Sequence, residues 1–210
     1  MRTFLFLAVI LGISAAYGVK HYSYTHSDDY VRERTVRLES PDGSCTGTMV
    51  FSPLNNKLYT LTAAHCEGLA FNGKILAETE SGEEKFLTIL KIDRNDDLML
   101  LANPWDKALY LNPELKFHQH VRAIGWGMGE RPFVSTGEVL RVAMLFVGDE
   151  YGTLTQHLLT TVFLRPGNSG GPLLDDDNNL VGIDVVGYTD SQFSGEVTPG
   201  VIQEFFKDVK

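Results

Sequence analysis

A glycine-rich loop around one serine is the first feature of the chain that could carry chemistry. Residues 166–173 read PGNSGGPL, with Ser169 in the middle. Such a constrained backbone can hold a hydroxyl at a fixed point and turn successive N–H groups towards one spot. Acyl transfer needs both, because its oxyanion must meet preorganised donors. The natural donors are the N–H groups of Gly167 and Ser169, although composition alone would also fit an ordinary turn.

A serine hydroxyl is a poor nucleophile without a base, so we next consider the histidines. His65 stands out because it ends a strand-like run at 58–62, and two alanines before it leave room for a close-packed turn. The other five lie in polar surroundings and are expected to be surface or structural residues. These are His21, His26, His118, His120 and His157. His65 is therefore the candidate general base.

A carboxylate that accepts the other imidazole N–H would hold the tautomer and stabilise the imidazolium. Asp97 precedes the apolar run 98–101, which would draw it to the edge of the core. Asp96 and Asp93 are close competitors in the same polar stretch. The residues alone leave the choice among these aspartates open.

The chain has two cysteines, Cys45 and Cys66. In an oxidising compartment two thiols that lie close together will pair, and Cys66 directly follows the candidate base. No second cysteine pair or His-x-x-x-His pattern accompanies them, so the sequence predicts no metal site and no cofactor.

The elements that must position these residues are short β-strands. Segments rich in β-branched and aromatic residues alternate with turns containing Gly, Asn, Asp and Pro, which is typical of an all-β sandwich or barrel. The expected strands are 31–38, 47–52, 58–62, 85–92, 98–102, 121–125, 138–147, 158–162, 173–174 and 180–186. Apolar pairs at 201–202 and 205–206 follow a Thr-Pro-Gly start signal and predict a C-terminal helix. Residues 111–119 are the expected crossover between two halves.

The first 18 residues are set apart by composition. A short positive start precedes an uncharged run at 4–16, and small residues would permit cleavage before Val19 or before Tyr17. We expect a signal peptide at 1–18, a lead-in at 19–30 and a protein that is secreted or periplasmic. The alternative is an uncleaved membrane anchor, although the run is shorter than the ~20 residues that span a bilayer comfortably. The net charge of −9 argues against nucleic-acid binding.

Three blocks together resemble a known family. TAAHC at 62–66, DLMLL at 97–101 and GNSGGPL at 167–173 match the signatures of trypsin/chymotrypsin-like serine peptidases, in the family order. GNSGGP and VRAIG at 121–125 are similar to compact bacterial and HtrA-type members, whereas the Ala-Ala-His-Cys block is trypsin-like. Only about 23 residues follow Gly187, so we expect no PDZ module.

The resemblance implies a chymotrypsin-like double six-stranded β-barrel with a short C-terminal helix. The peptidase domain would span 31–210, with barrels at about 31–112 and 120–197 and the helix at about 200–209. Ser169 would be the nucleophile, His65 the general base and Asp97 the orienting carboxylate. Gly167 and Ser169 would form the oxyanion hole. A disulfide from Cys45 to Cys66 would tether the histidine loop.

The resemblance also places the substrate. Val185, Val186 and Gly187 match the strand against which an extended peptide pairs. Phe163 takes the position of the specificity-pocket floor and is not acidic, so we expect cleavage beside an apolar or small residue. Asp184 would instead invite a basic residue if it projected into the pocket, but we expect it to face away or pair elsewhere. The partners are protein or peptide substrates, with a membrane only if the N-terminal segment is uncleaved.

One departure from the family bears on activation. Asn168 stands where zymogen-activated members carry an aspartate that pairs with a newly cut amino terminus, and an amide cannot form that ion pair. We therefore expect no processing beyond signal removal. The alternative to an enzyme is a catalytically inactive binding module with the same fold, although such proteins usually lose one of the three catalytic residues.

Overall fold

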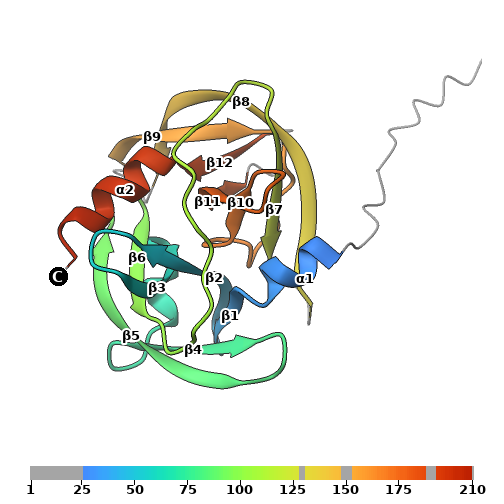
Figure 1. Ribbon diagram of the computed structural model, residues 1–210. Coiled ribbons are helices and arrows are strands. Elements are labelled where there is room, and N and C mark those ends of the chain that lie inside the picture. The colour runs from blue at the N-terminus through green and yellow to red at the C-terminus, as the bar shows by residue number, and fades with distance from the viewer. Residues whose placement is uncertain (1–25, 128–130, 148–152, 188–192, 210) are drawn as a thin grey trace, which may run out of the picture.

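The computed structural model describes residues 26–127, 131–147, 153–187 and 193–209. Within these residues, twelve strands form two closed barrels of six strands each. Figure 1 shows one barrel above the other, with the N-terminal barrel in blue and green and the C-terminal barrel in yellow to red. The expected double six-stranded barrel is confirmed. The predicted signal segment 1–18 lies outside the described residues.

The first barrel follows a short helix, α1 (His26–Arg32). Its strands are β1 (Thr35–Ser40), β2 (Gly43–Ser52), β3 (Lys57–Ala63), β4 (Lys74–Thr79), β5 (Glu84–Asp93) and β6 (Leu98–Ala102). They pair antiparallel in the order β1-β2-β3-β6-β5-β4, and β4 returns to β1. Leu38, Leu61 and Leu100 are fully buried in its interior. A 3-10 helix, η1 (Ala64–Leu69), follows β3 directly.

The second barrel repeats this architecture. Its strands are β7 (His120–Gly125), β8 (Phe133–Val147), β9 (Thr153–Thr160), β10 (Pro172–Leu174), β11 (Leu180–Gly187) and β12 (Ser194–Val197). Their order is β10-β11-β12-β9-β8-β7, and β10 pairs with β7 to close the barrel. The loop that carries Ser169 joins β9 to β10, so it begins and ends in this barrel.

The segment 103–119 connects the barrels and touches both. Leu109 forms a parallel bridge with Val50 of β2, and Leu111 forms one with Leu180 of β11. The N–H of Leu180 also donates to the carbonyl of Tyr110 at 2.8 Å. The expected crossover at 111–119 lies inside this segment. The connection therefore holds β2 and β11 at a fixed separation, and both strands lead to the candidate site.

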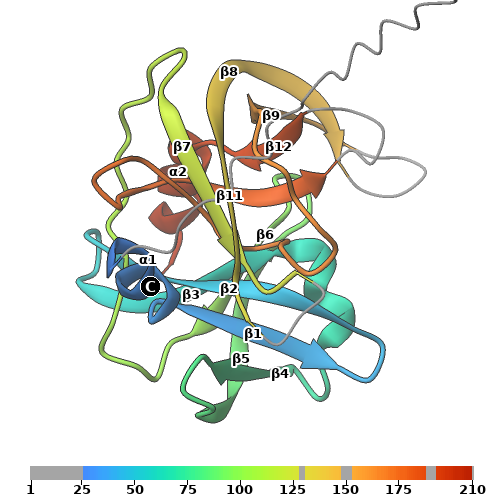
Figure 2. The same cartoon turned by 90° about the vertical axis from the view of Figure 1, so that its right-hand side faces the viewer.

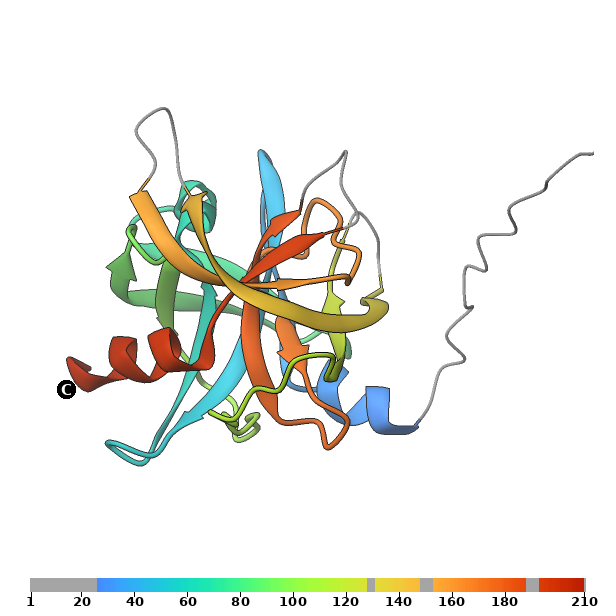
Figure 3. The ribbon, with the colours of Figure 1, turned by 90° about the horizontal axis from the view of Figure 1, so that it is seen from above.

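The C-terminal helix α2 (Pro199–Lys207) packs across the first barrel, although it follows the second. Thr198 caps its start by accepting from the N–H of Val201. The Phe206 ring lies 5.8 Å from the ring of Tyr59 on β3. Figures 1 and 3 show α2 and α1 on opposite sides of the molecule. The helix thus fastens the two barrels together on the side away from α1.

The structure differs from expectation at the start of the domain. Residues 31–38 were expected to be a strand, whereas α1 extends to Arg32 and β1 begins at Thr35. A buried ion pair between Asp28 and Arg122 of β7, at 2.7 Å, anchors this helix on the second barrel. Figure 2 shows α1 in blue at one edge of the molecule. The strand β4 also lies outside the predicted strands. Among the described residues, no helix is long and apolar enough to cross a membrane.

Candidate active site

Asp97 holds His65 at two points. Its Oδ2 lies 2.7 Å from Nδ1 of the imidazole, and its Oδ1 accepts the backbone N–H of His65 at 2.8 Å. The carboxylate is almost fully buried, whereas 46% of the His65 side chain is exposed. One carboxylate therefore fixes both the backbone and the ring of the histidine. The outer edge of the ring stays open to solvent.

The register of two strands brings Asp97 to this place. Ala63 at the end of β3 pairs with Leu98 at the start of β6, so the residues flanking the pair meet. The carbonyl of Asp97 accepts the N–H of Ala64. The backbone of Asp97 is left-handed, with a φ of 51°. Aspartate tolerates this region better than most residues. The strand pairing thus turns the carboxylate back towards the first turn of η1.

Asp96 is placed differently. Its backbone N–H donates to Oδ1 of Asp93 at 3.2 Å, as part of the turn before β6. Burial, together with the nearby carboxylate of Asp93, raises the pKa of Asp96. Of the two neighbouring aspartates that the sequence leaves as rivals, Asp97 is the one with hydrogen bonds to His65.

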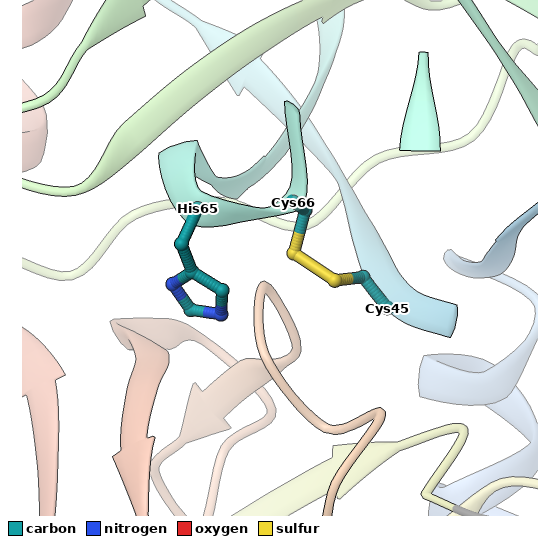
Figure 4. A group of neighbouring side chains, drawn as sticks. All are labelled: Cys45, His65 and Cys66. Atoms are coloured by element: carbon teal, nitrogen blue, oxygen red, sulfur yellow. A yellow bond between two sulfur atoms is a disulfide. The ribbon is translucent and has the colours of Figure 1, made fainter. Parts of the chain in front are cut away.

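A disulfide joins Cys66 of η1 to Cys45 of β2, with a Cα–Cα distance of 6.3 Å. Figure 4 shows the His65 ring and the disulfide leaving the same turn on the same side. Ligand-type atoms of these three residues lie within 4.8 Å of one another. The two sulfurs are bonded to each other, however, and only free thiolates are metal ligands. The group is therefore a tether for the histidine turn, and it presents no metal centre.

The loop carrying Ser169 packs against the first barrel. The carbonyl of Ser169 accepts the N–H of Thr46 at 2.8 Å, and the carbonyl of Gly170 accepts the hydroxyl of Thr48 at 2.8 Å. A Cβ on Gly170 would lie 2.2 Å from both the carbonyl oxygen of Thr46 and the hydroxyl of Thr62. Thr62 lies three positions before His65. The glycine lets the serine loop approach the strand that leads to the histidine.

The two predicted oxyanion donors differ from the N–H groups on either side of them. In the loop, the N–H of Asn168 donates to Arg165, that of Gly170 donates to Asp184, and that of Gly171 donates back to Asn168. Within the described part of the chain, the N–H groups of Gly167 and Ser169 have no acceptor. The φ of +97° at Gly167 belongs to a region that favours glycine. Among residues 167–171, the N–H groups of Gly167 and Ser169 are therefore the two without an acceptor in the described part of the chain.

Asn168 lies fully buried behind the loop. Its amide group packs against two glycines: a Cβ on Gly127 would lie 2.2 Å from the Asn168 Oδ1, and one on Gly125 would lie 3.0 Å from its Cγ. Neither amide atom has a hydrogen-bond partner among the described residues. The side chain occupies a close-fitting space at the end of β7, on the barrel side of the loop.

The end of β11 offers an open backbone edge. On one side, Val186 and Gly187 pair with Gly195 and Ser194 of β12. On the other side, the pairing of β11 with β10 stops at Ile183, and no described strand continues it. Val185 is buried, whereas Gly187 is exposed. The predicted substrate strand therefore has unpaired backbone groups, beginning one residue after the point where Asp184 binds the serine loop.

The structure separates the two predicted specificity residues. Phe163 is 60% exposed and meets the ring of Phe133 edge-on at 6.4 Å, beside Arg165, so its ring lies on the surface. Asp184 is fully buried, and its Oδ2 lies 3.3 Å from the position of a Cβ on Gly171. Its carboxylate oxygens have no hydrogen-bond partner among the described residues. Phe163 thus lies outside the interior, and Asp184 inside it.

Glu196 of β12 accompanies Asp184 and was missed by sequence reasoning. The two residues pair across β11 and β12 and are fully buried. Burial raises the pKa of Glu196 to about 8, although hydrogen bonds from Ser194 and Thr160 oppose the shift. Burial and the neighbouring Glu196 raise the pKa of Asp184 well above its usual range. The register of the final hairpin is the only signal that could have paired them.

The other described histidines have different surroundings, and the charge of Asp97 reaches only one of them, His157, strongly enough to act on its pKa. His118 and His120 are exposed and lie beside the carboxylates of Glu138 and Asp176. His157 of β9 is almost fully buried, and this burial lowers its pKa. His21 and the side chain of His26 fall outside the described residues. Of the described histidines, His65 is the one joined by hydrogen bonds to Asp97.

Comparison with known proteins gives a consistent result. The family model described as "Trypsin-like peptidase domain" matches residues 45–183. A probable periplasmic serine endoprotease, DegP-like, from Halomonas elongata is 32% identical over 130 residues, which cover 60% of this chain and 26% of that protein. The chain therefore spans about a quarter of the length of this relative.

Solved structures share the fold. The Rv3671c protease from M. tuberculosis, in its active form, superposes with a TM-score of 0.72 at 20% identity, covering 85% of this chain and 82% of that one. An HtrA-type protease solved with a tripeptide gives a TM-score of 0.71 at 20% identity, covering 87% of this chain and 62% of that one. At these identities the likeness concerns the fold, and it confirms the double barrel.

Proposed function

Because the chain belongs to the trypsin-like peptidase family, we propose that it is a serine endopeptidase with Ser169 as nucleophile, His65 as general base and Asp97 as orienting carboxylate. The observation that carries this proposal is the His65–Asp97 pair, with its 2.7 Å contact. The serine loop packs against the strand that leads to His65, and the N–H groups of Gly167 and Ser169 have no acceptor among the described residues. Thr46 connects the two parts of the site. Its N–H donates to Ser169 of the second barrel, and its carbonyl accepts the hydroxyl of Thr62 on the strand that leads to His65.

In the proposed mechanism each nitrogen of His65 has its own role. Nδ1 donates its proton to Asp97, which leaves Nε2 to accept the proton of the Ser169 hydroxyl. The serine oxygen attacks the substrate carbonyl, and the protonated His65 then gives the proton to the leaving amine. Water, activated by the same histidine, hydrolyses the acyl-enzyme and frees Ser169. Asp97 stabilises the imidazolium in both halves of the reaction.

The charge that develops on the substrate carbonyl oxygen requires donors that are already in place. In the proposed enzyme these are the N–H groups of Gly167 and Ser169, which have no acceptor within the described residues. The neighbouring N–H groups are bound by protein carbonyls. The oxyanion therefore has two preorganised donors and no need to displace an internal hydrogen bond.

The open edge at 185–187 supports binding of an extended peptide by strand addition. Since the substrate would then be held through its backbone, its side chains would be selected by the pocket beside this edge. With Phe163 on the surface and the pKa of Asp184 raised by burial, a fixed negative charge for a basic side chain is not favoured at neutral pH. We propose cleavage beside an apolar or small residue, tested by profiling a peptide library.

Two further properties belong to the proposal. We propose that the chain is exported with removal of residues 1–18, supported by the apolar N-terminal run, the Cys45–Cys66 disulfide and the periplasmic name of its relative. We also propose that it needs no internal activating cut, because Asn168 cannot form an ion pair with a new amino terminus. Mass spectrometry of the active, purified protein tests both, and a required internal cleavage would exclude the second.

A serine-reactive phosphonate probe tests the catalytic assignment. The wild-type protein should be labelled and should hydrolyse peptides, whereas Ser169→Ala and His65→Ala should do neither. His120→Ala serves as the matched control, because it removes an exposed histidine that pairs with Asp176 away from the serine loop. Absence of labelling and hydrolysis in well-folded wild-type protein would overturn the proposal and leave an inactive peptide-binding module.

A further inference from the structure

The threonine next to the disulfide makes an unusual set of contacts with the serine loop. Thr46 is fully buried in β2. Its backbone N–H donates to the carbonyl of Ser169, and its hydroxyl donates to the carbonyl of Gly167, both at 2.8 Å. These are the two residues whose own N–H groups are the proposed oxyanion donors. A single residue of the first barrel therefore binds the carbonyl groups of both residues that form the proposed oxyanion hole.

The hydroxyl of Thr46 has only one arrangement that satisfies its neighbours. The carbonyl of Gly167 can only accept, so the hydroxyl proton must point to it. The N–H of Trp126, which follows β7, then donates to the same oxygen at 2.8 Å. The hydroxyl thus links three segments: β2, the end of β7 and the serine loop.

The bond to Gly167 fixes a peptide plane. The peptide between Gly167 and Asn168 is held at its oxygen by the Thr46 hydroxyl and at its N–H by the carbonyl of Arg165, at 2.9 Å. Glycine has wide backbone freedom, and nothing in its side chain would stop this peptide from rotating. The N–H of Gly167 lies in the preceding peptide, which is joined to the fixed one only through φ and ψ of Gly167. Fixing the second peptide therefore limits the directions that this N–H can take.

Thr46 also connects this loop to the histidine. It follows Cys45, whose disulfide ends at Cys66 beside His65. Its carbonyl accepts the hydroxyl of Thr62 at 2.8 Å, on the strand that leads to His65. The residue therefore lies at the junction of the two loops that the proposed reaction must keep in register.

We propose that the Thr46 hydroxyl is a positioning group that sets the oxyanion hole. This inference rests on the proposed peptidase function. It predicts that loss of the hydroxyl weakens stabilisation of the transition state while substrate binding in the ground state is kept, because the backbone edge at 185–187 is untouched. The backbone N–H of Thr46 still binds Ser169 in any variant other than proline, so a side-chain change isolates the hydroxyl.

Two comparisons isolate the hydroxyl. The first compares the wild type with Thr46→Val, which removes the hydroxyl at nearly constant shape. The second compares Thr46→Ser with Thr46→Ala, two smaller side chains of which only serine has the hydroxyl. If the valine variant fails to fold, the serine and alanine variants still decide the question. Thr60→Val is the matched control, because Thr60 is also fully buried in the first barrel and its hydroxyl has no hydrogen-bond partner among the described residues.

The readouts are kcat and KM on a peptide substrate, active-site titration with the phosphonate, and the affinity of a peptide boronic acid that mimics the tetrahedral state. Removing one oxyanion donor outright costs about 10²–10³ in turnover, so displacing one should lower kcat by about 10- to 100-fold. We expect kcat per titrated site to fall by this factor in Thr46→Val and Thr46→Ala. Their KM should change little, and their affinity for the boronic acid should fall in parallel with kcat. Thr46→Ser and Thr60→Val should stay within about threefold of wild type.

Equal kcat per titrated site in Thr46→Ser and Thr46→Ala would overturn the positioning role while the wild-type enzyme remains active. The positioning role would also be overturned if the activity of each variant fell only in proportion to its fraction of titratable sites, since such a loss would reflect folding alone. An inactive and unlabelled wild-type protein would instead refute the proposed function. The two failures are therefore distinguishable.

Discussion

Asp97 receives hydrogen bonds from both the backbone N–H and the ring Nδ1 of His65, one on each carboxylate oxygen. This double contact separates it from Asp96, which neighbours it in sequence but binds Asp93 through its backbone. The pairing of Ala63 with Leu98 makes the arrangement part of the barrel itself. The position of the histidine ring is thus a consequence of strand register.

The first prediction compares the two aspartates. Asp97→Asn keeps the shape and tolerates the left-handed backbone, but an amide can offer N–H to Nδ1 and so favour the wrong tautomer. We expect kcat to fall about 10⁴-fold. Asp96→Asn should change kcat by less than about threefold, because its carboxylate has no hydrogen bond to His65 among the described contacts. Steady-state kinetics on both variants checks this, and the reverse order of effects would reassign the triad.

A second prediction concerns the approach of the serine loop to β3. In Gly170→Ala the new methyl group would lie 2.2 Å from the carbonyl of Thr46 and from the hydroxyl of Thr62, at a φ of +86°. We expect a loss of unfolding free energy above about 4 kcal/mol, together with loss of phosphonate labelling. Urea unfolding and probe labelling measure these two effects.

Gly73→Ala is the control for that clash. Gly73 has a similar φ of +72°, but a Cβ there meets no atom within 4 Å. Gly73→Ala should lower the free energy of unfolding by only about 1–2 kcal/mol, the cost of a left-handed non-glycine residue. Its phosphonate labelling should stay complete. Equal losses in the two variants would mean that backbone conformation, and not the close approach of the loop, explains the glycine at 170.

The candidate residues of this site were easier to propose from the sequence than the contacts around them. Ser169 and His65 lie in local motifs whose residue types acyl transfer needs, so they stand out as candidates without tertiary information. Asp97 could not be separated from Asp96 by composition, because only the β3–β6 register decides which of them faces the histidine. The structure supplied that register.

The missed features are those that depend on distant partners. Helix α1 is short and polar and is anchored by the buried pair of Asp28 with Arg122, which lie 94 positions apart. Glu196 meets Asp184 only through the pairing of β11 with β12. Thr46 has no recognisable motif of its own, and its contacts are with a loop more than 120 positions away. Local propensity carries no information about such contacts.

A third prediction concerns the disulfide. Cys45 and Cys66 close a loop of 21 residues, which in the chain-entropy model corresponds to about 3 kcal/mol of stability. We expect Cys45→Ser/Cys66→Ser to lower the melting temperature and to reduce kcat by loosening the turn that holds His65. Calorimetry and kinetics with and without a thiol reductant test this. A double variant that melts and turns over like the wild type would show that strand pairing alone holds the turn.

The fourth prediction follows from the buried carboxyls. The pKa of Glu196 is raised to about 8 in the folded protein, from an ordinary value of 4.5 when unfolded, and that of Asp184 is raised as well. Between these pH values the folded state binds more protons than the unfolded state, so stability falls as pH rises from about 5 to about 8. His157 acts oppositely at lower pH, since burial lowers its pKa and its neutral form is favoured in the folded protein.

Stability should therefore be greatest on the acidic side of neutrality and decline towards pH 8, by an amount on the order of 2–4 kcal/mol. Glu196→Gln removes one of the two carboxyls and should flatten the decline between pH 6 and pH 8. Glu114→Gln, an exposed change, should leave the profile unchanged. Urea unfolding at a series of pH values measures the slope. A wild-type stability that rises over this range would mean that the pair is ionised in the folded barrel and stabilised by groups other than Ser194 and Thr160.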